Sequence, residues 1–125
     1  MKEKFLFILI LIITGCGTTK KDLSFNTSFE NGNEKINFEV LSNKQVLKLN
    51  KINKTRFILK NIDKSKVSIS GKSIRTSENN KLFENEIHLD MSPKEEDLVD
   101  GRLNVFLTYK MQEKLRFFKL QIPVE

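Results

Sequence analysis

The chain is poor in the residues on which most enzyme and metal sites depend. Among its 125 residues there are one cysteine, one histidine, one tyrosine, five glycines and no tryptophan. A zinc site needs several Cys and His ligands, and a hydrolytic site needs a nucleophile with a base and an orienting group. The few glycines form no phosphate-binding run. We therefore predict that the protein is not an enzyme and that it binds no cofactor and no metal.

The residues that come nearest to a site have simpler interpretations. His88 lies between Ile87 and Leu89, which belong to an inward apolar row. Because neighbouring residues of a strand point to opposite faces, we expect His88 on the solvent side. The acidic residues between positions 95 and 100 lack the Asp-x-Asp-x-Asp-Gly spacing of a calcium loop, which favours a solvated turn. The absence of tryptophan argues against an aromatic platform for sugars.

The basic charge of the chain comes mainly from lysine. The net charge is +6, and only Arg56, Arg75, Arg102 and Arg116 are arginines. A protein that recognises nucleic acid usually carries more arginine, because its planar group grips phosphate in a bidentate way. The lysines are scattered among acids, so we interpret them as a solvated surface and predict no nucleic-acid partner. A weak attraction to anionic lipid headgroups stays open as an alternative.

The longest apolar run lies at the N-terminus. Phe5–Ile13 holds nine residues, which is about half of the ~20 that a membrane-spanning helix needs. A charged start, Met1-Lys2-Glu3-Lys4, precedes the run, and the small residues Thr14 and Gly15 follow it. This layout is typical of a secretory signal peptide.

The residues at the end of this run are Ile13-Thr14-Gly15-Cys16, and they resemble the lipobox of bacterial lipoproteins. The resemblance implies cleavage before Cys16 and acylation of Cys16, for example by palmitate, which anchors the protein in a membrane. Two or three chains hold stably, since each buried CH₂ contributes ~0.8 kcal/mol. The alternative is a plain signal peptide with an incidental cysteine. Cleavage leaves 110 residues with net charge +5 and no disulfide, enough for one domain.

The same resemblance favours the outer membrane of the cell envelope. Gly17 stands where lipoproteins retained in the enterobacterial inner membrane carry aspartate. Lys20-Lys21-Asp22 is similar to the short charged export signals of surface lipoproteins in Bacteroidetes. We predict a signal peptide at 1–15, a lipidated cysteine and flexible tether at 16–33, and a β-sandwich domain at 34–125. Leu23 and Phe25 form either a first edge strand or loosely docked apolar contacts.

From Ile36 onward the apolar residues recur with period 2, which indicates strands. Turn-forming clusters separate these rows at intervals of roughly 8–12 residues, the rhythm of an all-β sandwich. We therefore predict a single small β-sandwich of about seven strands, with a short helical turn that Ser92 caps and Pro93 begins. The expected strand segments are 36–40, 46–49, 55–59, 67–69, a short one from 74, a row of Phe83, Ile87, Leu89 and Met91, then 103–109 and 118–124.

The order of segments from Phe83 to Val124 resembles part of an immunoglobulin-like domain. A strand, a short acidic turn, Asp100-Gly101 and a strand hairpin follow one another as in the E–F corner and F–G hairpin. The resemblance implies an immunoglobulin-like sandwich, without the disulfide and core tryptophan of antibody domains. Val67–Gly71 and Phe118–Pro123 are also similar to immunoglobulin-like periplasmic domains of gliding-motility and type IX secretion proteins.

The last predicted hairpin carries the strongest signal for a partner. Arg116, Phe117 and Lys119 lie close together in sequence, and adjacent Phe117 and Phe118 must point to opposite faces of a strand. If Phe118 is in the core, Phe117 contacts a partner, or both faces of this strand are buried, or Phe25 or Phe29 of the tether covers Phe117. We therefore expect a non-enzymatic module that binds an unidentified envelope protein or serves an envelope assembly. The alternative is a binder or carrier of a small apolar or glycan ligand.

Overall fold

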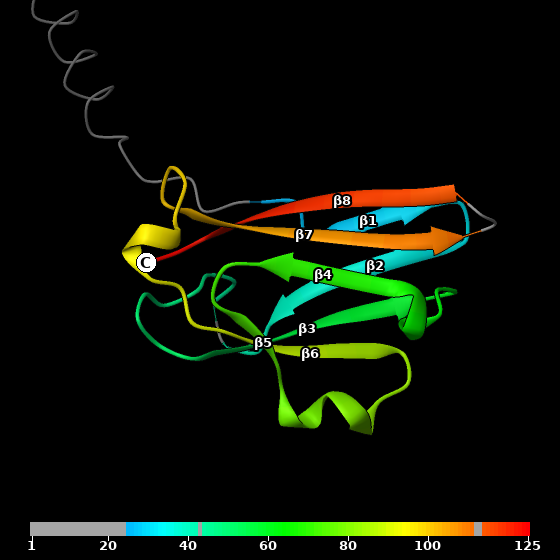
Figure 1. Ribbon diagram of the computed structural model, residues 1–125, viewed down its shortest axis with the longest axis horizontal. Helices are drawn as coiled ribbons and strands as arrows, with labels where there is room; N and C mark the ends of the chain where they lie inside the picture. The colour runs from blue at the N-terminus through cyan, green and yellow to red at the C-terminus, as the bar shows by residue number, and fades with distance from the viewer. Residues whose placement is uncertain (1–24, 43, 112–113) are drawn as a thin grey trace, which may run out of the picture.

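The computed structural model describes residues 25–42, 44–111 and 114–125, so Cys16 and the predicted signal peptide lie outside the described residues. Two antiparallel sheets face each other and confirm the predicted all-β sandwich, with strands that run along the length of the molecule (Figure 1). The eight strands are β1 (Ser28–Asn31), β2 (Glu34–Val40), β3 (Asn53–Lys60), β4 (Val67–Gly71), β5 (Ile74–Thr76), β6 (Glu86–Met91), β7 (Arg102–Met111) and β8 (Lys114–Pro123).

The strands form two sheets, and the chain passes from one sheet to the other several times. The five-stranded sheet has the order β1-β2-β3-β6-β5, and the three-stranded sheet has the order β4-β7-β8. The chain crosses between the sheets after β3, after β4 and after β6. A parallel bridge from Leu47 to Val124 joins the loop between β2 and β3 to the residue that follows β8.

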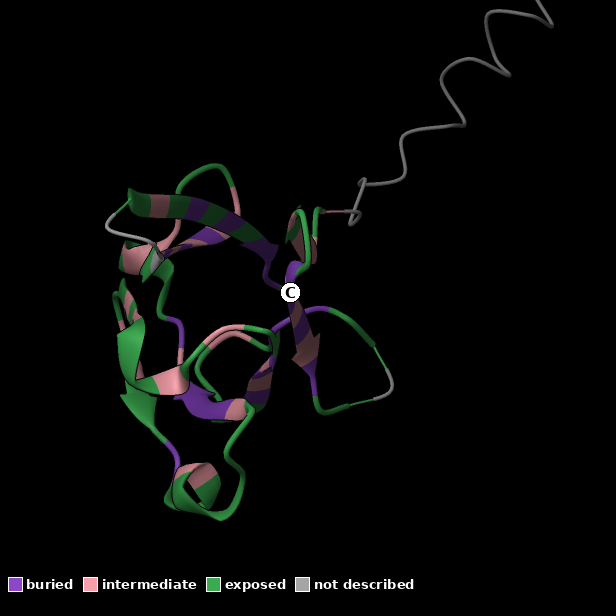
Figure 2. Cartoon of the chain, turned by 90° about the vertical axis from the view of Figure 1, so that its right-hand side faces the viewer, coloured by how far each residue is buried: buried purple, intermediate pink, exposed green. Residues whose placement is uncertain are grey.

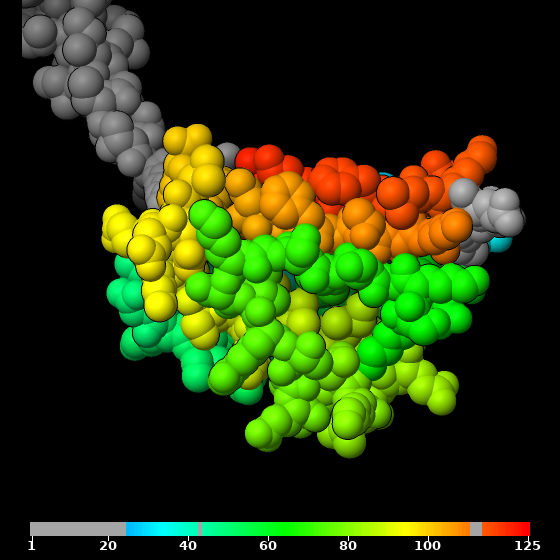
Figure 3. Space-filling model, in the orientation of Figure 1, coloured from blue at the N-terminus to red at the C-terminus, as the bar shows by residue number. Residues whose placement is uncertain are grey.

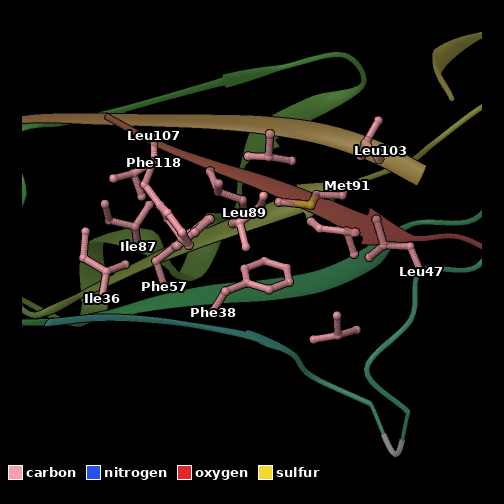
Figure 4. Packing of buried hydrophobic residues seen from close by; sticks show 14 of the residues in the cluster. Ile36, Phe38, Leu47, Phe57, Ile87, Leu89, Met91, Leu103, Leu107 and Phe118 are labelled. Atoms are coloured by element: carbon pink, nitrogen blue, oxygen red, sulfur yellow. The ribbon is translucent and has the colours of Figure 1, made fainter. Parts of the chain in front are cut away.

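The core lies between the sheets and is built from the period-2 rows. Leu103, Val105, Leu107 and Tyr109 of β7 are buried, and they face the rows of β2, β3 and β6. Figure 4 shows side chains such as Ile36, Phe57 and Leu107 pointing toward one another from the two sheets. Buried and exposed residues alternate as bands along β8 (Figure 2). Apolar burial on this scale provides the main stabilisation of the fold.

Three segments differ from the sequence-based expectation. The sheet begins at Ser28, so the folded part starts within the segment 16–33 that was expected to be a tether. Residues 46–49 form no strand, because only Leu47 makes a bridge there. The helical turn is a 3₁₀-helix at Glu95–Asp97, which begins after Lys94 and not after Ser92.

The 3₁₀-helix begins after Lys94 because the Asp97 side chain binds the backbone at that point. The Asp97 carboxylate accepts hydrogen bonds from the Ser73 hydroxyl at 2.6 Å and from the Lys94 amide at 3.0 Å. The Ser73 hydrogen bond, followed by the Lys94 amide, lowers the pKa of Asp97. The same contacts tie the turn to the segment between β4 and β5.

Candidate functional site

The face of the five-stranded sheet that points away from the core is a network of paired charges. Arg56 of β3 contacts Glu39 of β2 at 2.7 Å and Glu86 of β6 at 3.5 Å. Asp90 lies between Lys54 at 2.9 Å and Arg75 at 3.6 Å. Cross-strand pairs of this kind satisfy one another, so the charges of Arg56 and Asp90 are matched within the sheet.

His88 belongs to this network, and the expectation that it is exposed was wrong. It is only 6% exposed, because the 3₁₀-helix Glu78–Leu82 and Phe83 fold over it. Phe83, expected in the inward row of its strand, instead stacks on the His88 ring outside the core, with ring centroids 5.0 Å apart. The His88 Nε2 atom lies 2.8 Å from Glu86 Oε1. The histidine therefore works as a packing residue of this face.

The outward face of the three-stranded sheet has a different character. Phe106 of β7 and Leu115, Phe117 and Lys119 of β8 share this face, and we call these four residues the β7–β8 outer face. Leu115 and Phe117 are 71% and 58% exposed. In the space-filling view, β7 and β8 lie side by side as a continuous band along the molecule (Figure 3). Large apolar side chains grouped on a surface indicate an interaction site.

Local contacts hold these side chains in place. The Phe106 and Phe117 rings lie 6.0 Å apart, and Lys119 Nζ lies 5.8 Å from the centre of the Phe106 ring. The ring contact and the cation over a ring are each favourable at a partly exposed site. No carboxylate belongs to the described positions of this face, so its charge is positive without a matching acid.

The structure separates the three residues that were predicted as a partner contact. Phe117 and Lys119 share the outer face, while Arg116 lies on the opposite side of β8 and pairs across the sheet with buried Tyr109. Phe25 and Phe29 do not cover Phe117, because they pack against Phe38, Tyr109 and Phe118 inside the sandwich. Phe106 and Leu115 were missed. The period-2 rule would have placed Leu115 beside Phe117 and excluded Arg116.

Arg116 instead belongs to a polar cluster inside the sandwich, near the β7–β8 turn. The Tyr109 hydroxyl, Glu34 Oε2 and Arg116 Nε are buried there, and the Tyr109 hydroxyl lies within hydrogen-bonding reach of Asn31 and Glu34. Asn31 donates a hydrogen bond to the other Glu34 oxygen at 3.1 Å. Burial, followed by the Glu34 charge, raises the pKa of Tyr109.

The raised pKa of Tyr109 predicts a loss of stability at high pH. The folded state favours the neutral phenol, so this contribution is fully present below about pH 10, the ordinary tyrosine range. It is lost as the pH rises through the folded-state pKa. Because Tyr109 is the only tyrosine and the chain has no tryptophan, tyrosinate absorbance measures its pKa directly. Unfolding of the Tyr109→Phe variant should lose this alkaline pH dependence; an unshifted titration in the folded chain would contradict it.

A second surface feature is a groove of about 1090 Å³ at one side of the sandwich. Leu59 and Val67 line it from the two sheets, and Ile62 and Phe83 add apolar surface. Lys64 Nζ donates to the carbonyl oxygens of Asn80 and Phe83 and so ties the loop after β3 to the loop before β6. The groove combines apolar walls with charges of both signs, since Asp63 and Glu84 line it together with Lys64 and Lys81.

Comparison with known protein families, curated proteins and solved structures finds no relative of this chain. No family model matches the chain, and no curated protein or solved structure matches it either. In the ranges that the structure describes, no helix is long and apolar enough to cross a bilayer. Within the same ranges, no three His, Cys, Asp or Glu side chains gather as a metal-binding group. The case for a function therefore depends on the residues themselves.

Proposed function

We propose that this protein is a lipid-anchored, non-enzymatic component of a bacterial cell envelope that binds another envelope protein. The observation that carries the proposal is the β7–β8 outer face, where Leu115 and Phe117 stand exposed beside Lys119. Exposed aromatic and aliphatic side chains beside a cation are the composition of protein-binding hot spots. The lipobox-like Ile13–Cys16 supports the anchor, with the outer membrane as the favoured location.

The strand order supports an immunoglobulin-like assignment. Strands β2-β3-β6-β5 and β4-β7-β8 follow one another as the A-B-E-D and C-F-G strands of constant-type immunoglobulin sandwiches do. In this correspondence β1 is an additional edge strand, and β7 and β8 are the F and G strands. Sandwiches of this type commonly act as binding modules of cell surfaces, which agrees with a non-enzymatic function.

The test is a crosslinking pull-down from intact cells with the full-length chain. We expect the Leu115→Ser/Phe117→Ser variant to lose at least about tenfold of the captured partner, since two central contacts cost a few kcal/mol. The matched control is Ile52→Ser/Leu82→Ser, because Ile52 and Leu82 are 56% and 71% exposed, away from this face. The Cys16→Ala variant, exported by a standard signal peptide, tests the anchor separately.

Equal capture by both double variants would show that the β7–β8 outer face does not bind the partner. Retention in the membrane fraction of a chain that combines Cys16→Ala with Leu115→Ser/Phe117→Ser would contradict the anchor, because neither a lipid nor the partner could then hold it there. The captured protein counts as a partner only when its recovery falls in the first double variant and not in the second.

The groove favours a second candidate, the binding of a small amphipathic ligand. Its walls include Ile62, Val67 and Phe83, and its lining also holds Lys64 and Lys81 together with Asp63 and Glu84. A small zwitterion with a short apolar chain fits this combination. Mass spectrometry of an organic extract of the purified chain tests it: a bound compound that disappears in Phe83→Ser supports this function, and an empty extract rejects it.

A further inference from the structure

Strand β8 is an edge of the three-stranded sheet, and its pairing defines which backbone groups face outward. The register with β7 runs without interruption from Arg102↔Pro123 to Met111↔Lys114. The Val124 amide donates to Gly101 on the β7 side, while the Pro123 carbonyl and the Glu125 amide bond to Leu47 on the other side. Since the N–H and C=O of a residue in an antiparallel strand point the same way and alternate, odd-numbered residues of β8 face away from β7.

Within the part of the chain that the structure describes, the outward backbone groups in the central part of β8 are unpaired. The Pro123 carbonyl is taken by Leu47, and the Gln121 carbonyl accepts from Arg102 at 3.0 Å. In the described ranges no backbone hydrogen bond joins the outward groups of Leu115, Phe117 or Lys119 to another segment. An exposed row of N–H and C=O groups is a template for one more strand.

The same three residues carry the exposed side chains of the β7–β8 outer face. A strand paired with this edge would therefore gain backbone hydrogen bonds and would lay its own side chains beside Leu115 and Phe117. Alternate residues of such a strand point to one face, which gives both affinity and selectivity. A helix or a loop could use the apolar contact but not the row of outward amides.

The charge around this edge decides between possible occupants. Lys119 lies on its outer face and Lys114 at its end, and the described positions of β8 hold no carboxylate. Arg116 on its inner face lies near Glu34 and adds no charge to the outer face. The whole chain has a net charge of +6. A second copy would bring the same positive charge to the interface, whereas an acidic segment would be attracted.

Building on the proposed function, we propose that the partner binds by adding an extended acidic segment as a fourth strand beside β8. Apolar residues of this segment alternate with Asp or Glu. Its backbone pairs with Leu115, Phe117 and Lys119, and its apolar side chains extend the β7–β8 outer face.

The test uses synthetic peptides of about eight residues, a common strand length, with the full-length chain in a nonionic detergent. One peptide alternates valine and glutamate, a second alternates valine and lysine, and a third is the glutamate peptide with alternate amides N-methylated. We expect the glutamate peptide to bind at least about tenfold more tightly than the other two, because charge and backbone pairing both contribute.

A pair of variants isolates the backbone contribution. Lys119→Pro removes an outward N–H without removing a bond to β7, as proline is tolerated at such edge positions. Lys119→Ala removes the same charge and keeps the N–H. We expect Lys119→Pro to weaken binding of the glutamate peptide several-fold more than Lys119→Ala does.

Hydrogen exchange measures the pairing residue by residue. In the free chain the amides of Leu115, Phe117 and Lys119 should exchange fast, while those of Arg116, Phe118 and Leu120 are protected by β7. Peptide or captured partner should slow only the first group. Equal affinity for the glutamate and lysine peptides, or unchanged exchange in the complex, would overturn the proposal. Partner loss in Leu115→Ser/Phe117→Ser with unchanged exchange would refute strand pairing while the proposed function stands. Concentration-dependent protection in the free chain would identify a second copy as the occupant.

Discussion

Replacing Asn53 with alanine is expected to destabilise the fold by about 2–4 kcal/mol, because the buried Met91 carbonyl and the partly buried backbone groups of Lys48 and Lys51 lose their partner at once. The Asn53 side-chain oxygen accepts from the Lys48 amide at 2.8 Å, and its amide nitrogen lies within 3.0 Å of the carbonyl oxygens of Lys48, Lys51 and Met91. Asn53 thus attaches the loop between β2 and β3 to β6. This loop carries Leu47, which bridges to Val124 at the end of β8.

The control for Asn53 is Gln45, which performs a similar task on the surface. The Gln45 side chain bonds both the amide and the carbonyl of Val40, at 3.0 Å each, but Gln45 is exposed. Water replaces its bonds after mutation, so Gln45→Ala should cost less than about 1 kcal/mol. Urea unfolding measures both variants. Equal losses would show that burial of Asn53 does not matter, and Asn53→Asp, which keeps the acceptor and loses the donors, should remain destabilised.

The rows of the core could be predicted from the sequence, because the alternation of a strand is a local property. Leu103, Val105, Leu107 and Tyr109 are two residues apart, and each is buried as expected. The same local rule separates Phe117 from Phe118. This local rule does not predict which distant segments cover the outer faces of the sheets. His88 is buried because residues 78–83 fold over it, and nothing in the alternation around His88 indicates that cover.

The β7–β8 outer face was predicted only in part, for a related reason. Nearness in sequence grouped Arg116 with Phe117 and Lys119, although alternate residues of a strand face opposite ways. Phe106 joins the face from β7 through the cross-strand register, which is a property of the hairpin. The order of strands across the two sheets is likewise non-local. The strand order depends on which strands pair after the chain has crossed from one sheet to the other. The apolar pattern of a single strand does not specify this pairing.

The second prediction with a large effect compares two phenylalanines that have opposite environments. Phe57 of β3 is fully buried and packs against Phe38 with ring centroids 5.0 Å apart. Truncation to alanine leaves a cavity between the sheets, so Phe57→Ala should cost about 3–5 kcal/mol. For a domain of this size the loss lowers Tm by at least about 12 °C. Thermal unfolding followed by circular dichroism measures it.

Phe117→Ala provides the matched comparison, because it removes the same atoms from the β7–β8 outer face. Its ring is 58% exposed and leaves no internal cavity, so stability should change by no more than about 0.5 kcal/mol. Binding should show the reverse order, since Phe117 carries a central contact with the proposed partner while Phe57 contributes only through folding. A large stability loss in Phe117→Ala would mean that this ring supports the sheet itself, and the outer face would then lose its main argument as a binding surface. A stable Phe117→Ala variant that no longer captures the partner separates the two tasks of the phenylalanines: those between the sheets hold the sandwich together, and those outside remain free to bind.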